Sequence, residues 1–287
     1  MKPLLPILAL LLVLVGCQPQ TGSDRPVVTV SIEPQKYLLE QIVGDKVEVK
    51  TLMASGGNPE TYEPTFTHLM NVDNSLAYFR VGGLGFEEAI LGKIQEANPD
   101  LKIYDTSKGI KPVMGTHYHG DALHVETEPD PHTWSSVKNA RVIIRNMVEA
   151  MKSVDPDNSK YYQKNYERFD QTLDSLDKVY SARLLPHKNE AFLVWHPSLS
   201  YFARDYGLEQ IAVGQEAKES SVRDLQDAID HAVDHRARVF FFQKEYDSRQ
   251  AEAVNEKVGG RRVDINPLSP DWLGEMDRIV NALTDGK

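Results

Sequence analysis

Three side chains in this sequence could share a metal ion: Glu60, His132 and His196. Each lies in a loop beside a predicted strand or helix, and Asp264 and Asn266 lie at the end of another predicted strand. Neutral imidazole and carboxylate groups are normal zinc ligands. Nitrogen ligands favour zinc over manganese, and additional oxygen ligands narrow that preference. We therefore predict a divalent cation bound by the two histidines, by Glu60 and by one of the last two residues.

The elements that position these side chains alternate between strands and helices. Strands are predicted at 27–32, 47–53, 76–82, 101–105, 191–195, 208–213, 238–243 and 261–265, and most are separated by helical runs. This alternation indicates βαβ units and parallel sheets. Ligands of open parallel sheets bind beyond the carboxyl ends of the strands. The sequence therefore predicts an α/β fold with two lobes, 27–154 and 187–287, that face one another across a ligand cleft.

A long amphipathic helix is predicted between the lobes, at 155–186. It begins with Asp155-Pro156, a cap residue followed by proline, and Pro186 ends it. Apolar residues recur on one face at steps of three and four: Tyr162, Tyr166, Phe169, Leu173, Leu176, Tyr180 and Leu184. About 29 residues would extend roughly 44 Å, enough to run the length of a domain. We expect one rigid helix joining the lobes of a monomer, because a single stripe this short rarely dimerises alone.

The first 17 residues are typical of a lipoprotein signal. One lysine precedes an apolar run, 4–15, which is shorter than the roughly 20 residues that a transmembrane helix needs. The run leads into LVGC, which resembles a bacterial lipobox, and Cys17 is the only cysteine. Exported chains normally use cysteines in pairs, so a lone one at the cleavage point favours a lipid anchor. We predict a signal at 1–17, an anchor at Cys17 and a flexible tether at 18–26.

The charge balance argues against a nucleic-acid partner. The formal net charge is −10, and it becomes −11 when Lys2 is removed with the signal. An acidic protein repels nucleic acid, and the sequence has no basic cluster with interleaved aromatic residues. The composition fits a soluble protein that is held at a membrane by its lipid only.

Several motifs, taken in order, resemble one known family along nearly all of the mature chain. They are SIEPQKYLLEQIVGDKVEVKTLM, NPETYEPT, DPHTW, HPSLSYFARDYGLEQI and INPLSPDW. The chain resembles the solute-binding lipoproteins of zinc/manganese ABC importers. This resemblance implies two α/β lobes joined by one long helix, with the metal between them. It also implies a receptor and not an enzyme, exported to the periplasm or cell surface, with an ABC permease of the inner or cytoplasmic membrane as its partner.

Three of the four predicted ligands stand at ligand positions of the family, and one of the three differs from the family in residue type. His132 and His196 stand where the family has its second and third ligands. The family usually has a histidine where this chain has Glu60. Manganese receptors of the family have a glutamate as third ligand, so His196 favours zinc. Zn²⁺ is therefore the expected cargo, and a manganese or iron receptor is the alternative.

The fourth ligand departs further from the family pattern. The usual aspartate aligns with Asn266, and a frequent glutamate aligns with Gln243. An amide oxygen is a weaker, neutral metal ligand. The fourth position is therefore taken by Asn266 or water, or else Asp264 or Glu245 moves in.

Four of the nine histidines lie within GTHYHGDALHVETEPDPHTW. His132 belongs to the fixed site, because DPHTW leads directly into a helix. The others are His117, His119 and His124. The resemblance implies a flexible capture loop at 115–131, which we expect to be unstructured because of its glycines and Pro129. The alternative is a solvated polar loop without a metal role.

His231 and His235 lie four residues apart on a predicted helix. That spacing allows two imidazoles to share a metal ion. Neighbouring aspartates, among them Asp230 and Asp234, favour a solvated acidic face instead.

A zinc-dependent hydrolase is the competing function. Two histidines and a glutamate with an open fourth position also form a catalytic zinc site. Such a site needs a general base beside the bound water. Glu63 is the only candidate near Glu60, and nothing in the sequence positions it.

Overall fold

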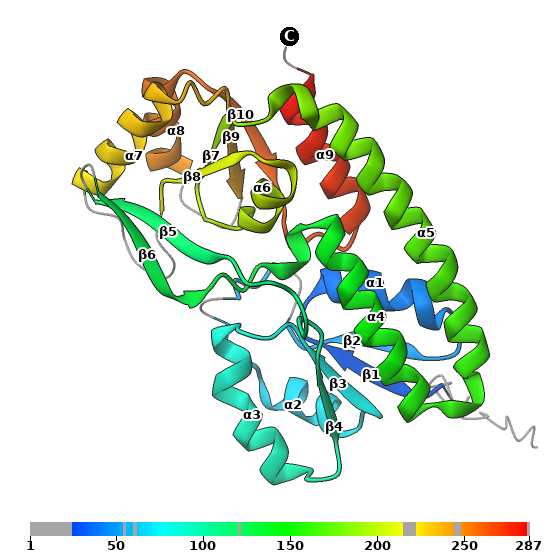
Figure 1. Cartoon of the computed structure of the whole chain (residues 1–287). Coiled ribbons are helices and arrows are strands. Elements are labelled where there is room, and N and C mark those ends of the chain that lie inside the picture. The colour runs from blue at the N-terminus through cyan, green and yellow to red at the C-terminus, as the bar shows by residue number, and fades with distance from the viewer. Residues whose placement is uncertain are drawn as a thin grey trace, which may run out of the picture.

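Two four-stranded parallel sheets, one in each half of the chain, form the centre of the fold (Figure 1). The computed structural model describes residues 25–53, 56–59, 62–119, 122–214, 222–243 and 248–285. The first sheet has the order β2-β1-β3-β4, and the second has the order β10-β9-β7-β8. All neighbouring strands within these two sheets run parallel. The predicted α/β fold with two parallel-sheet lobes is confirmed.

The strands lie where the sequence predicts them, trimmed by a few residues. They are β1 (Val27–Val30), β2 (Glu48–Thr51), β3 (Ala77–Arg80), β4 (Lys102–Asp105), β7 (Ala191–Val194), β8 (Glu209–Ala212), β9 (Val239–Gln243) and β10 (Arg261–Ile265). The central strands β7 and β9 are buried along their whole length. Continuous apolar runs are typical of parallel strands that are covered on both faces. The edge strands β2 and β10 are only partly buried.

Helices and short 3₁₀ turns connect these strands. The helices are α1 (Glu33–Val43), α2 (Phe66–Asp73), α3 (Gly85–Ala97), α4 (Val137–Val154), α5 (Ser159–Leu184), α6 (Ser200–Tyr206), α7 (Val222–Asp234), α8 (Ser248–Val258) and α9 (Trp272–Thr284). Pro34 lies in the first turn of α1, where its missing N–H costs no hydrogen bond. Gly44 ends that helix with a φ of 56°, a value that favours glycine.

Helix α5 runs along one side of both halves (Figure 1). Its 26 residues extend about 39 Å, with the 3₁₀ turns Pro156–Asn158 and Leu185–His187 at its two ends. Near its start, Asn165 Nδ2 donates a 2.9 Å hydrogen bond to the Ile42 carbonyl of α1. Near its end, Tyr180 Oη donates to Asp277 Oδ1 of α9 at 2.5 Å. The helix is therefore fastened to elements of both halves.

The histidine-rich segment forms a β-hairpin, so the predicted unstructured loop is wrong. Strand β5 (Met114–His119) pairs antiparallel with β6 (Ala122–Pro129). Thr, Tyr and Val favour strands, and only two residues separate β5 from β6, the usual length of a tight hairpin connection. His117 and His124 are register partners. The hairpin extends away from the sheets to lie beside α7 (Figure 1).

The predicted signal, Cys17 and most of the tether lie outside the described residues. Within the described ranges, the helices are too short or too polar to cross a bilayer. The boundaries at 154–155 and 186–187 stay predictions about domains, although α5 begins and ends within them.

A buried carboxyl group ties the ends of β1 and β3 together. Glu87 of α3 is fully buried and accepts hydrogen bonds from the backbone N–H groups of Val81 (2.7 Å) and Gly82 (2.9 Å). The hydroxyl of Ser31 also donates to it. Burial raises the Glu87 pKa from 4.5 to about 7 against the opposing effect of these hydrogen bonds. The charged form is therefore disfavoured in the folded protein.

This raised pKa predicts a pH dependence of stability. Below pH 4.5 Glu87 is protonated in both states, and its contribution is fully present. As pH rises towards and through about 7, ionisation lowers the free energy of unfolding by up to about 3 kcal/mol. Urea unfolding between pH 4.5 and 8 should show this decline in the native chain and lose it in Glu87→Gln. The exposed neighbour variant Glu88→Gln should keep the decline, and an equal slope in all three proteins would contradict the prediction.

Candidate metal centre

His132 is held by a carboxylate two residues before it. The sequence Asp130-Pro131-His132 enters the 3₁₀ turn Thr133–Ser135, which leads into α4. Asp130 Oδ1 accepts hydrogen bonds from the His132 backbone N–H at 2.7 Å and from Nδ1 at 2.8 Å. Both side chains are buried. The carboxylate therefore keeps a proton on Nδ1 and leaves Nε2 as the ring nitrogen that can accept or bind a metal.

His196 follows β7 directly and is held through its backbone. The Gln243 side chain at the end of β9 accepts from His196 N–H (3.2 Å) and donates to the His196 carbonyl (3.1 Å). The same amide nitrogen donates to Ser198 Oγ at 2.7 Å. Gln243 and Ser198 are almost completely buried. The Gln243 carboxamide therefore fixes the backbone turn that directs the His196 ring towards His132.

The two histidines, 64 residues apart in sequence, meet. His132 Nε2 and His196 Nε2 lie 3.1 Å apart, with the ring planes at 74°. Two nitrogens on one tetrahedral zinc ion are separated by about 3.3 Å, given Zn–N distances near 2.0–2.1 Å. Because His132 carries its proton on Nδ1, His196 Nε2 is the donor of this contact. A zinc ion would replace that shared proton with little movement of either ring.

The electrostatic environment keeps His196 neutral. Burial lowers the pKa of His196 well below its ordinary value, and the neighbouring His132 lowers it further. A metal ion binds only the unprotonated imidazole. Protons therefore compete with a metal ion for this ring only at a pH well below 6.5.

A small cavity lies against the histidine pair, at the carboxyl ends of strands from both sheets. Its volume is about 30 Å³. The described residues that line it are Asn58, Pro59, His132, Trp134, His196, Ser198, Gln243, Pro267 and Leu268. This space accommodates an ion or a water molecule, and it is far below the several hundred Å³ of typical organic-ligand pockets.

The structure does not bring the other predicted ligands to the histidine pair in the same way. Glu60 lies outside the described residues, next to Pro59 of the cavity wall. Asn266 Oδ1 accepts from the Leu268 N–H at 3.1 Å, so it caps its own turn in this structure. Asp264 pairs with Arg262 at 2.9 Å and is half-exposed. Glu245 also lies outside the described residues. The complete ligand set remains a prediction.

Two positioning residues are not predicted by the sequence patterns. Asp130 is given no role there, and Gln243 stands only where the family frequently has a glutamate. The spacing Asp-Pro-His is a local signal for the first, because an acid two residues before a histidine can accept from its backbone and its ring. Nothing local marks Gln243, since its partner His196 lies 47 residues away.

Two tryptophans form hydrogen bonds that hold the loops beside the cavity together. Trp134 Nε1 donates to the Pro267 carbonyl at 2.8 Å, and Trp272 Nε1 donates to the Trp134 carbonyl at 2.8 Å. Both indoles are fully buried. These bonds join the turn that carries His132 to the chain that follows β10.

Removal of one indole N–H donor should lower the stability of the protein. Trp134→Phe leaves the buried Pro267 carbonyl without its partner and removes apolar contact, so we expect a loss of about 2–4 kcal/mol in the free energy of unfolding. Denaturant titration of the metal-depleted protein measures it. Trp195→Phe, in the separate cluster that contains Phe242, controls for the loss of volume. An equal cost in both variants would show that the hydrogen bond contributes nothing.

The fold and the cavity define a two-lobe binding protein with an ion-sized site between parallel sheets. Comparison with known proteins then identifies the family. The sequence pattern of the family "Zinc-uptake complex component A periplasmic" (ZnuA) matches residues 28–286, and the chain belongs to this family. The resemblance seen in the motifs is confirmed.

Individual relatives cover most of the chain. The high-affinity zinc uptake system protein ZnuA of Bacillus subtilis is 26% identical over 92% of this chain and 84% of its own length. The zinc-binding lipoprotein AdcA of Streptococcus pneumoniae is 26% identical over 95% of this chain and 58% of its own length. A crystal structure of a ZnuA deletion mutant with zinc bound is 32% identical, with a TM-score of 0.81 over 91% of this chain and 97% of that one.

Proposed function

We propose that this protein is an extracytoplasmic receptor that binds Zn²⁺ between its lobes and delivers it to an ABC-type membrane importer. The observation that carries the proposal is the buried pair of imidazoles, whose Nε2 atoms lie 3.1 Å apart beside an ion-sized cavity. Membership of a zinc-uptake family supports it. Zinc is the cargo, and no reaction is catalysed.

The proposed ligands are His132, His196 and Glu60, with Asn266 or water in the fourth position. Two nitrogens and one carboxylate suit zinc better than manganese. Pro59, the residue before Glu60 in the sequence, lines the cavity. Asn266 would have to give up its bond to Leu268, which makes water, Asp264 or Glu245 competing candidates.

We propose attachment to the membrane through a lipid on Cys17, with the mature chain a monomer in the periplasm or at the cell surface. The LVGC motif and the named lipoprotein AdcA among the relatives support the anchor. The partner is a permease of the inner or cytoplasmic membrane. Release of zinc there requires only a small tilt between the lobes, because α5 is fastened to α1 and α9.

The hydrolase alternative is disfavoured by the size of the site. A cavity of about 30 Å³ beside the histidines holds an ion but not a peptide or ester. A general base near a zinc-bound water is also required, and the described residues at the cavity wall offer no carboxylate for this role.

Metal content and metal competition test the proposal. We expect the purified protein to carry zinc, and the chelator-treated protein to take up one tightly bound zinc per chain in the presence of a hundredfold excess of Mn²⁺ or Fe²⁺. Equal occupancy of the tight site by manganese or iron would overturn the assignment of the cargo. Turnover of esters or peptides by the zinc-loaded protein would revive the hydrolase.

A further inference from the structure

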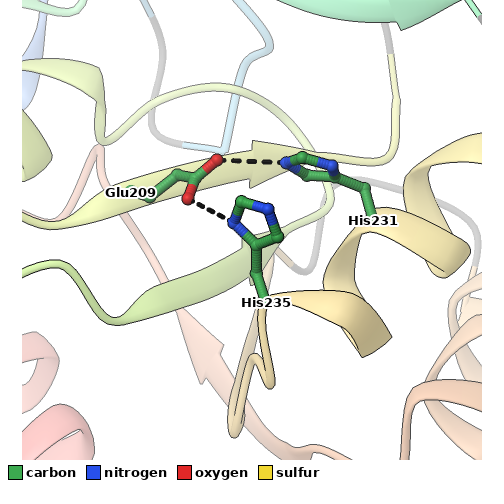
Figure 2. Close-up of side chains that lie close together, drawn as sticks. All are labelled: Glu209, His231 and His235. Atoms are coloured by element: carbon green, nitrogen blue, oxygen red, sulfur yellow. Dashed lines mark hydrogen bonds and ion pairs between the residues drawn. The ribbon is translucent and has the colours of Figure 1, made fainter. Parts of the chain in front are cut away.

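Three side chains that do not line the cleft gather on the second half of the molecule. Glu209 of β8 faces His231 of α7 and His235, which follows this helix directly (Figure 2). His231 Nε2 lies 3.1 Å from Glu209 Oε1, and His235 Nδ1 lies 2.6 Å from Glu209 Oε2. One ligand atom from each residue lies within 4.8 Å of the other two.

The fold builds this cluster from an edge strand and a helix end. Strand β8 is the edge of the second sheet, and α7 packs against it. The His235 N–H donates to the His231 carbonyl at 3.0 Å, which continues the helical turn and keeps both rings on one face. The ring centroids are 4.0 Å apart. Both rings therefore present a nitrogen to the same carboxylate.

The cluster is open to solvent and separate from the cleft. The exposed fractions of the side chains are 21% for His231, 41% for His235 and 35% for Glu209. None of the three lines the cavity beside His132 and His196. An ion can therefore reach it from solution without any movement of the lobes, and water can complete its coordination.

We propose that Glu209, His231 and His235 form a second Zn²⁺ site, on the surface of the protein. Two imidazole nitrogens and one carboxylate oxygen are a three-ligand zinc set, with water in the remaining position. The carboxylate already draws both rings together, so little side-chain order has to be gained on binding. Donors on a tetrahedral zinc ion lie about 3.3 Å apart. The three ligand atoms already lie within 4.8 Å of one another, so a small rotation of the exposed His235 ring suffices to reach this spacing.

This inference goes beyond the proposed function and does not depend on it. The surface site has three protein ligands and exposed side chains, so it binds zinc more weakly and exchanges it faster than a buried cleft. The surface site contains none of the hairpin histidines, although strand β5 of the hairpin contacts α7. A receptor of this design carries one buried and one exchangeable ion.

The test isolates the surface site by removing the other candidates. The background chain carries His132→Ala and His196→Ala in the cleft and His117→Asn, His119→Asn and His124→Asn on the hairpin. Calorimetric titration with Zn²⁺ should show one ion per chain. Adding Glu209→Gln or His235→Ala should weaken this binding at least tenfold. Glu190→Gln alters the pair that this residue forms with His187 at 2.9 Å and should leave the affinity unchanged.

Two outcomes overturn the surface site. Absence of zinc binding by the background chain would show that the cluster is a set of hydrogen bonds only. Equal zinc affinity with and without Glu209→Gln and His235→Ala would lead to the same conclusion. If the background chain does not fold, crystals of the intact chain soaked in Zn²⁺ decide the question. An anomalous peak between Glu209 and the two rings supports the site, and a peak in the cleft alone refutes it while leaving the proposed function intact.

Discussion

Replacing His132 or His196 with alanine should abolish stoichiometric zinc binding in the cleft. Each ring supplies one of the two Nε2 atoms that lie 3.1 Å apart. Loss of a partner that only orients a metal ligand typically costs 10–100-fold in affinity, so loss of a ligand itself should cost more than about 100-fold. Competition with a chromophoric zinc chelator measures the effect. Glu209→Gln in every protein removes the proposed surface site from the measurement.

A buried histidine outside the cleft provides the matched control. His187 is 7% exposed and hydrogen-bonded to Glu190, so His187→Ala removes a buried ring without touching the cavity. Its zinc affinity should equal that of the parent. Zinc at 1,000 times the parent's dissociation constant should stabilise the parent and this control by about 4 kcal/mol, and each cleft variant by less than about 1.4 kcal/mol. Unchanged affinity in both cleft variants would refute the site.

The sequence predicted the sheets and long helix well because their signals are local. Each strand is a short apolar run bounded by turn residues, and the helix has one apolar stripe ended by Pro186. The stripe reappears in the structure as buried or half-buried positions, among them Tyr162, Phe169 and Tyr180. The packing of α5 on α1, α4 and α9 follows from that stripe.

The structure has a hairpin where the sequence predicts a loop, because strand propensity outweighs the glycines and charges of this segment. Histidines and acids in 115–131 indicate a polar segment, but polar residues occur in exposed strands as well as in loops. The alternation of Thr116, Tyr118 and, on the other strand, Leu123 and Val125 is the signal that carried more information.

Chain topology brings two of the predicted ligands, His132 and His196, together, whereas contacts between distant segments position residues that no sequence pattern marks. The rule that ligands lie at strand ends located His132 and His196, which the fold brings together. Gln243 and Glu209 owe their roles to partners 47 and 22 residues away. The spacing of two histidines on a helix was visible, but the carboxylate that completes their set came from a neighbouring strand.

Asp130→Asn should lower the zinc affinity of the cleft by about 10–100-fold, the usual cost of losing a carboxylate that orients a ligating histidine. Asp130 Oδ1 accepts from both the backbone N–H and Nδ1 of His132. The charge fixes the tautomer in which Nε2 binds the metal and strengthens that nitrogen as a donor. Asparagine can still accept one hydrogen bond, but it has no charge and can present its NH₂ group to Nδ1, which favours the wrong tautomer.

The substitution Asp130→Asn also distinguishes an effect on the orientation of His132 from an effect on folding. The Asp130 backbone carbonyl accepts from Tyr201 Oη at 2.7 Å, and this bond survives the change to asparagine, so the metal-depleted variant should unfold close to the parent. Asp105→Asn, which alters a partly buried ion pair with Arg80 away from the cavity, should leave zinc affinity unchanged. In Asp130→Asn, the His132 ring protons followed by NMR should report a shift towards the Nε2–H tautomer. A zinc affinity within twofold of the parent, with the tautomer unaltered, would show that His132 is positioned without its carboxylate.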